Sequence, residues 1–170
     1  MRLRCLLRGQ GLPRWGNLRR VSPFSENFGA ERGTPVDRPY IEAFFATHAD
    51  SITGDVLEIQ APGYTHRFGR EVRAAHAVDI NPRFLPTYCC DLASAETVIP
   101  DDHYDCFLLP QTLQHLRDVD QALRNILRVV KPGGVILASA AGLMPLIPDG
   151  HDYWRCSTQG WRELVGRAWA

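Results

Sequence analysis

The chain has 170 residues, of which 45% are hydrophobic and 22% are charged, and its formal net charge is zero. This length and composition are typical of one soluble globular domain, and a zero net charge gives no indication of nucleic-acid or membrane binding. The five cysteines lack the CxxC spacing of a zinc site and suit small apolar positions in a reducing compartment. We therefore expect a cytoplasmic protein without a metal centre.

The first 33 residues are rich in glycine, proline and arginine. The first 25 contain six arginines and no acidic residue. Such a start is typical of either a flexible basic tail or a targeting peptide, and Pro13 and several glycines, which interrupt any long helix, favour the tail. No apolar run is long enough to span a membrane. We expect residues 1–33 to be a flexible segment and residues 34–170 to form the folded domain.

A strand, a turn, a helix and a second strand are predicted between residues 55 and 80. The first apolar strand contains Glu58, and the second, residues 75–80, contains Asp79, 21 positions later. A spacing of about 20 residues places an acid near a ribose in nucleotide-binding βαβ units. The turn after the first strand, residues 60–63, has one glycine, although such turns need glycine where the backbone approaches a ligand. The pattern predicts a nucleotide-binding unit with an atypical turn.

Strands and helices alternate along the rest of the domain. Before this unit, apolar residues at helical spacing predict a helix near residues 40–45. After it, we expect strands at 87–90, 104–109 and 135–138. Further helices are predicted from Asp118, as N-cap, to the KPGG segment at 131–134, and over 158–167. This alternation predicts an open parallel α/β sheet that binds ligands at the carboxyl ends of its strands.

With these elements in order, the chain resembles the class I S-adenosylmethionine (SAM)-dependent methyltransferases. It is most similar to small bacterial domains of this class that often accompany glycosyltransferases. The matching segments are RGTPVDRPYIEAF (32–44), VLEI (56–59), YTHRFG (64–69), VDINP (78–82), YDCFLLPQTLQHLRDV (104–119), LRVVKPGGVILAS (127–139) and DYWRCS (152–157).

The resemblance implies a Rossmann-like sheet with helices on both faces, lacking the last two strands of the family. It also implies that SAM is the cofactor, with Asp79 at the ribose, Asp91 and Leu92 at the adenine, and Pro110 and Gln111 where substrate and methyl group meet. The implied cofactor-binding residues are Glu58, Gln60, Gly63, Asp79, Ile80, Asp91, Leu92, Pro110 and Gln111.

Two of these positions leave alternatives open. Glu58 is either close to the methionine part of SAM or an acceptor for backbone amides of the following turn. Gln60 stands where the family usually has glycine, so its side chain would occupy space near the carboxypropyl group of the cofactor, while Gly63 would let the turn adapt. The resemblance also implies that the family continues beyond Ala170.

His115, His151 and Asp152 are the candidate catalytic bases. His115 lies between the fourth strand and the next helix, where packing is the alternative role. His151 and Asp152 belong to a loop with aromatic residues and Arg155, which suits a sugar or another polar acceptor. In the alternative interpretation, Trp154 fills the core and Arg155 pairs with an acid.

The predicted function is SAM-dependent methylation of a small-molecule or glycan acceptor, most simply at a hydroxyl oxygen. A glycosyltransferase is the predicted partner. The alternative is a non-catalytic methyltransferase-like binding or scaffold module associated with glycan biosynthesis. A nicotinamide-dependent dehydrogenase fits less well, because the only lysine, Lys131, lies in KPGG and not in a Tyr-x-x-x-Lys pair.

Overall fold

The computed structural model describes residue 21, residues 33–142, residue 144 and residues 151–169. The fold is that of the compact unit Val36–Ala170. The predicted tail, residues 1–33, lies almost wholly outside the described residues, so its flexibility stays a prediction. Within the described part of the chain, no helix is long and apolar enough to cross a membrane.

The described residues form one five-stranded parallel sheet, in the order β3-β2-β1-β4-β5. The strands are β1 (Gly54–Ile59), β2 (Val72–Asp79), β3 (Tyr88–Cys89), β4 (Tyr104–Leu109) and β5 (Val130–Ala138). The prediction of an open parallel α/β sheet is confirmed. The order reverses between β1 and β4, and parallel sheets bind ligands outside the carboxyl ends of the strands at such a point.

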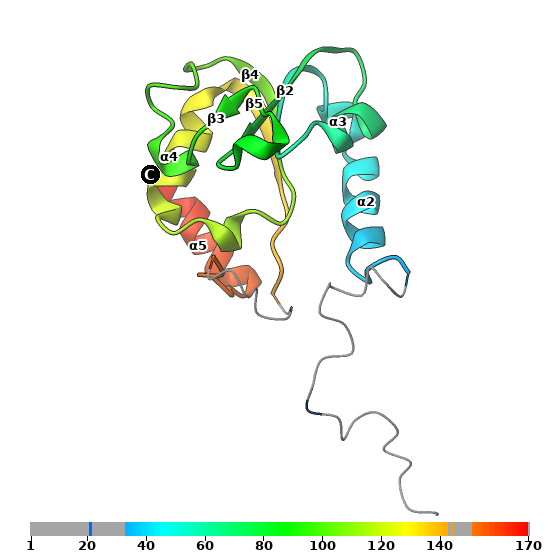
Figure 1. The fold of residues 1–170 in the computed structure, drawn as a ribbon, viewed down its shortest axis with the longest axis vertical. Helices are drawn as coiled ribbons and strands as arrows, with labels where there is room; N and C mark the ends of the chain where they lie inside the picture. The colour runs from blue at the N-terminus through cyan, green and yellow to red at the C-terminus, as the bar shows by residue number, and fades with distance from the viewer. Residues whose placement is uncertain (1–20, 22–32, 143, 145–150, 170) are drawn as a thin grey trace, which may run out of the picture. The chain divides into compact units, whose positions relative to one another are not determined.

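Helices cover both faces of the sheet. The α-helices are α2 (Arg38–Thr47), α3 (Gly63–Phe68), α4 (Val119–Val129) and α5 (Thr158–Ala168). The short 3-10 turns are η3 (Ala49–Ser51), η4 (Pro82–Phe84), η5 (Leu92–Ser94) and η6 (Leu113–His115). Figure 1 shows α2 and α3 on one side of the sheet and α4 and α5 on the other. Two separate clusters of buried hydrophobic residues correspond to these two sides.

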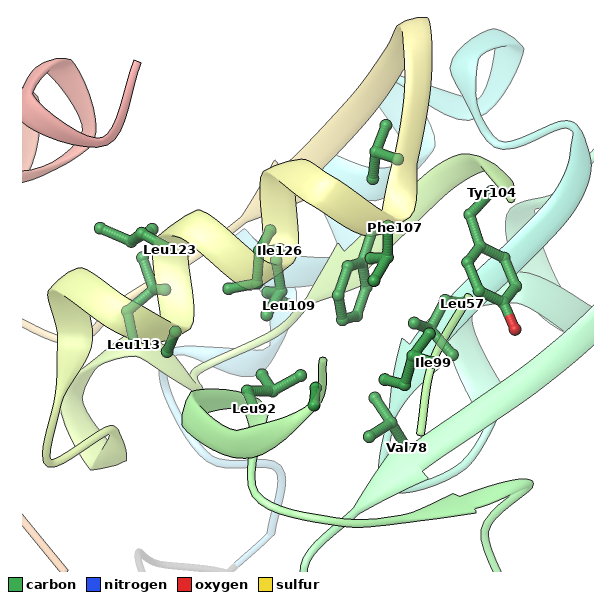
Figure 2. Close-up of a cluster of buried hydrophobic side chains, with 14 of the residues drawn as sticks. Leu57, Val78, Leu92, Ile99, Tyr104, Phe107, Leu109, Leu113, Leu123 and Ile126 are labelled. Atoms are coloured by element: carbon green, nitrogen blue, oxygen red, sulfur yellow. The ribbon is translucent and has the colours of Figure 1, made fainter. Parts of the chain in front are cut away.

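The larger cluster lies between the sheet and α4. In Figure 2, Ile126 of α4 points toward Leu109 of β4, and Phe107 lies beside them. All three side chains are at most 1% exposed. The predicted cap is confirmed, because the Asp118 Oδ1 accepts a 3.0 Å hydrogen bond from the Gln121 backbone N–H. The cap fixes the first turn of α4, and the apolar stripe of the helix packs against the sheet.

The prediction that KPGG separates the helix from a strand beginning at residue 135 is wrong. The last strand, β5, begins at Val130, directly after α4. Its pairing with β4 shifts register between Tyr104 and Cys106, and Gly133 adopts a φ of 82°. The left-handed conformation of this glycine lets KPGG stay within the strand as an irregularity.

Four charged residues meet at the amino ends of β1 and β4. The Arg73 Nη2 lies 2.7 Å from Asp55 and 2.6 Å from Asp105. The Lys131 Nζ lies 3.3 Å from Asp55 and 2.9 Å from Asp105. Hydrogen bonds from Arg73, and then from Lys131, lower the pKa of Asp55 from 3.8 to about 2. This cluster ties β2 and β5 to the central strands at the edge opposite the carboxyl ends.

The low pKa of Asp55 predicts a loss of stability in acid. Because its folded pKa is below its unfolded value of 3.8, the ionised carboxylate stabilises the fold above that pH. The contribution disappears as the pH falls from about 4 to about 2. We expect Asp55→Asn to flatten this part of the stability–pH curve in urea unfolding. Asp50→Asn, at an exposed ion pair with Arg70, is the control, and an unchanged curve for Asp55→Asn would contradict the assignment.

Candidate functional site

A cavity of about 690 Å³ lies at the carboxyl edge of the sheet. Its volume is in the usual range for small-molecule sites, about 300–1,000 Å³. The predicted site residues that line it are Gln60, Asp79, Ile80, Asp91, Leu92, Pro110, Gln111, His115 and His151. Glu58, Gly63 and Asp152 are not among the lining residues. The cavity therefore brings together residues that follow β1, β2, β3 and β4.

Asp79, the last residue of β2, and Asp91, two residues after β3, are held in the same way. The Asp79 Oδ1 accepts a 2.6 Å hydrogen bond from the Asn81 backbone N–H, and the Asp91 Oδ1 accepts a 2.9 Å bond from Ala93. No described residue donates a hydrogen bond to the second oxygen of either carboxylate. In each acid one oxygen fixes the side chain and the other can accept from a ligand. Such a pair of acceptors suits the hydroxyls of a ribose and the amine of an adenine.

The turn after β1 has the backbone shape that a glycine would give. Gln60 has a φ of 70°, in the left-handed region, and its N–H donates a 3.0 Å hydrogen bond to the carbonyl of Val78. Its side chain is exposed at the cavity. The backbone is thus held against β2 in a conformation that glutamine adopts at a cost.

We expect Gln60→Gly to stabilise the domain by up to about 1 kcal/mol, because glycine adopts a positive φ without strain. Gln159→Gly, in the first turn of α5, is the matched control and should destabilise by up to about 1 kcal/mol. Urea unfolding of both variants measures the two effects. Equal destabilisation by both would show that the turn is not strained.

The Glu58 carboxylate accepts hydrogen bonds from the first turn of α3. Its side chain is 2% exposed, and its Oε1 accepts a 2.9 Å hydrogen bond from the Tyr64 N–H. Its Oε2 accepts from the Thr65 N–H at 2.8 Å and from the Thr65 hydroxyl at 2.7 Å. Burial raises the pKa of Glu58, and the hydrogen bonds from these donors oppose the rise. This geometry favours the acceptor role over contact with a cofactor.

Residues 151–154 are bound to the η6 turn. The backbone N–H groups of Tyr153 and Trp154 donate to the carbonyl of Gln114 at 2.9 and 3.2 Å. The Trp154 indole N–H donates to the carbonyl of Leu116 at 2.7 Å, and its ring packs against the larger core cluster. These contacts hold His151 and Tyr153 at the wall of the cavity.

The candidate bases have different surroundings. The His115 Nδ1 lies 2.5 Å from the carbonyl of His151, which can only accept, so Nδ1 carries the hydrogen and Nε2 is the basic nitrogen. That Nε2 lies 3.3 Å from the side-chain nitrogen of Gln114. Asp152 is paired with Arg155, and its side chain is 6% exposed. The alternative interpretation of this loop, in which Trp154 packs against the core and Arg155 pairs with an acid, is therefore observed, and the acid is Asp152.

Sequence reasoning missed the residues that position Gln111. This residue has a φ of 50°, and its N–H donates to the Ser139 hydroxyl at 3.1 Å. The Gln114 side chain, which is fully buried, donates to the Gln111 carbonyl at 2.8 Å. Arg38 and Tyr64, which also line the cavity, were missed as well. Both lie in segments that carry the family resemblance, and this was the available signal.

Part of this chain is similar to known methyltransferases. A family described as "Methyltransferase domain" matches residues 62–138. The ubiquinone/menaquinone biosynthesis C-methyltransferase UbiE of Pseudomonas aeruginosa is 33% identical over 86 residues, which cover 50% of this chain and 31% of UbiE. UbiE of Francisella tularensis is 35% identical over 63 residues, 35% of this chain and 25% of that protein. The chain thus spans about a third or less of these curated relatives.

Solved structures show the same fold at low sequence identity. A SAM-dependent methyltransferase from Archaeoglobus fulgidus superposes with a TM-score of 0.59 at 14% identity, over 82% of this chain and 71% of that one. One from Mesorhizobium loti gives 0.55 at 15% identity, over 81% of each chain. The [4+2]-cyclase SpnF gives 0.54 at 19% identity, over 75% and 57%. The predicted class I SAM-dependent methyltransferase fold is confirmed, and its occurrence in a cyclase means that the reaction needs its own argument.

Proposed function

We propose that this domain binds SAM at the carboxyl edge of the sheet and transfers a methyl group to a small-molecule acceptor. The observation that carries the proposal is the pair of carboxylates, Asp79 and Asp91, each with one oxygen held by backbone and the other available at a cavity of about 690 Å³. Asp79 would hold the ribose, and Asp91 with Leu92 the adenine. The turn at Gln60 and the side chain of Ile80, which both line the cavity, would face the amino-acid part of SAM.

The chain's own residues would align the acceptor and exclude water. When bound, SAM supplies a methyl group on a positively charged sulfur. Alignment by the protein is worth about 7–11 kcal/mol in well-oriented reactions, and a base adds about 10²–10⁴-fold. We assign His115 the role of base, because its Nδ1–H is held by the His151 carbonyl. Its Nε2 would accept the proton in place of the 3.3 Å contact with the Gln114 side-chain nitrogen. Pro110 and Gln111, at the end of β4, would lie where acceptor and methyl group meet.

For the acceptor atom we propose a hydroxyl oxygen, in a small molecule or a glycan. The hydroxyls of Thr112 and Tyr153 and the imidazole of His151 line the cavity and can hydrogen-bond a hydroxylated acceptor. Both UbiE relatives are described as C-methyltransferases, so transfer to carbon is the competing outcome. A glycosyltransferase partner remains part of this proposal and rests on the family resemblance alone.

Titration calorimetry with SAM and with its demethylated product, S-adenosylhomocysteine, tests the proposal. We expect micromolar binding by the natural chain, because the Gln60 turn already has the glycine-like conformation. Binding only by Gln60→Gly would show that the glutamine side chain blocks the cofactor. If neither protein binds these ligands, the proposed methyltransferase activity is contradicted. The alternative of a non-catalytic binding or scaffold module would then be favoured.

A further inference from the structure

Arg38 lies at the start of α2 and lines the cavity on the side formed by α2 and α3. Its Nη1 donates a 2.6 Å hydrogen bond to the hydroxyl of Tyr64. Tyr64 is itself fixed, because its ring lies 4.6 Å from that of Phe45 and 6.2 Å from that of Phe68, measured between centroids. Its backbone N–H is bound by the buried carboxylate of Glu58. The guanidinium is thus anchored at one nitrogen, and its remaining N–H groups can donate to a ligand.

Arg38 differs from its neighbouring arginines in having no carboxylate partner within the described part of the chain. Arg67 pairs with Glu42 through two hydrogen bonds, at 2.6 and 2.9 Å. Arg70 and Arg73 are also paired with acids. A guanidinium keeps its charge at any physiological pH. A cavity wall that carries an unpaired, anchored guanidinium is therefore suited to an anion.

We propose that Arg38 and Tyr64 together bind a carboxylate group inside the cavity. The planar N–H groups of arginine match the two oxygens of a carboxylate. The Tyr64 hydroxyl accepts from Arg38, so its own hydrogen can be donated to the same ligand. The carboxylate belongs either to the amino-acid part of the cofactor or to the acceptor. The inference rests on the proposed function, which places both molecules in this cavity.

Calorimetric titration with two adenosine ligands tests whether the bound carboxylate is that of the cofactor. S-adenosylhomocysteine carries the carboxylate, whereas 5′-methylthioadenosine keeps the adenosine and the thioether without it. If Arg38 binds the cofactor, Arg38→Gln should lower the affinity for S-adenosylhomocysteine by at least about tenfold. The affinity for 5′-methylthioadenosine should change by less than about twofold. Tyr64→Phe, which keeps the ring, should cause a smaller loss in the same direction. Arg67→Gln, outside the cavity lining, is the matched control and should change neither affinity.

Two further pairs of ligands test the acceptor as the source, with the protein saturated by S-adenosylhomocysteine. These pairs are 4-hydroxybenzoate with 4-hydroxybenzamide, and glucuronate with glucose. Preference for the charged member of either pair by at least about tenfold, lost in Arg38→Gln, would assign Arg38 to the acceptor. If Arg38→Gln changes none of these affinities while S-adenosylhomocysteine still binds, this inference alone is overturned. If the natural chain binds neither adenosine ligand, the proposed function is overturned and this inference with it.

Discussion

Replacing Asp79 with asparagine should weaken the binding of S-adenosylhomocysteine by at least about tenfold. The substitution keeps the Oδ1 acceptor for the Asn81 N–H, which lies 2.6 Å away, so the local turn is retained. It removes the charge and turns the second acceptor into a donor, which cannot accept from a ribose hydroxyl. A charged hydrogen bond contributes about 1.5–3 kcal/mol, which corresponds to the expected loss. Calorimetric titration measures this loss.

The matched control for this experiment is Asp118→Asn. Asp118 also accepts a hydrogen bond from a backbone N–H, that of Gln121, and it does not line the cavity. Its asparagine variant should therefore bind S-adenosylhomocysteine like the natural chain. Unchanged affinity in Asp79→Asn would remove Asp79 from the ribose site. A similar loss in both variants would point to a general effect on the fold.

The acids of the site could be predicted because their place depends only on strand ends. Asp79 and Asp91 each follow an apolar run, and the carboxyl ends of parallel strands meet at one edge of a sheet. Local pattern was therefore enough to bring them together, and the cavity contains both. The same reasoning found Pro110 and Gln111 at the end of β4.

The rest of the site depends on contacts between distant segments, which local pattern does not contain. Residues 151–154 are held at the cavity by the carbonyls of Gln114 and Leu116, more than 30 positions earlier. The hydrogen bond from Arg38 in α2 to Tyr64 in α3 joins residues that are 26 positions apart. The role of Glu58 depended on which way its side chain points from β1. Only the position of α3 determines that direction.

Glu58→Ala should have the largest effect on stability, a loss of about 3–5 kcal/mol in urea unfolding, because three donors lose their acceptor. The substitution leaves the N–H groups of Tyr64 and Thr65 and the hydroxyl of Thr65 without their acceptor. Thr65 is 1% exposed, so water does not readily replace the lost oxygens. Each unsatisfied buried donor costs about 1–3 kcal/mol. Glu163→Ala, on the exposed side of α5, is the control and should change stability by less than about 0.5 kcal/mol.

The competing term is the cost of burying the charge of Glu58, which is reflected in its raised pKa. If that cost exceeded the gain from the three hydrogen bonds, Glu58→Ala would be neutral or stabilising. Glu58→Gln separates the two terms, because it removes the charge and keeps one acceptor oxygen, so a loss between those of alanine and the natural residue is expected. Tyr64 carries the anchor of Arg38, so the alanine variant should also weaken binding that depends on Arg38. If Glu58→Ala lowers stability without changing that binding, Glu58 stabilises α3 but does not determine the position of Arg38 at the cavity.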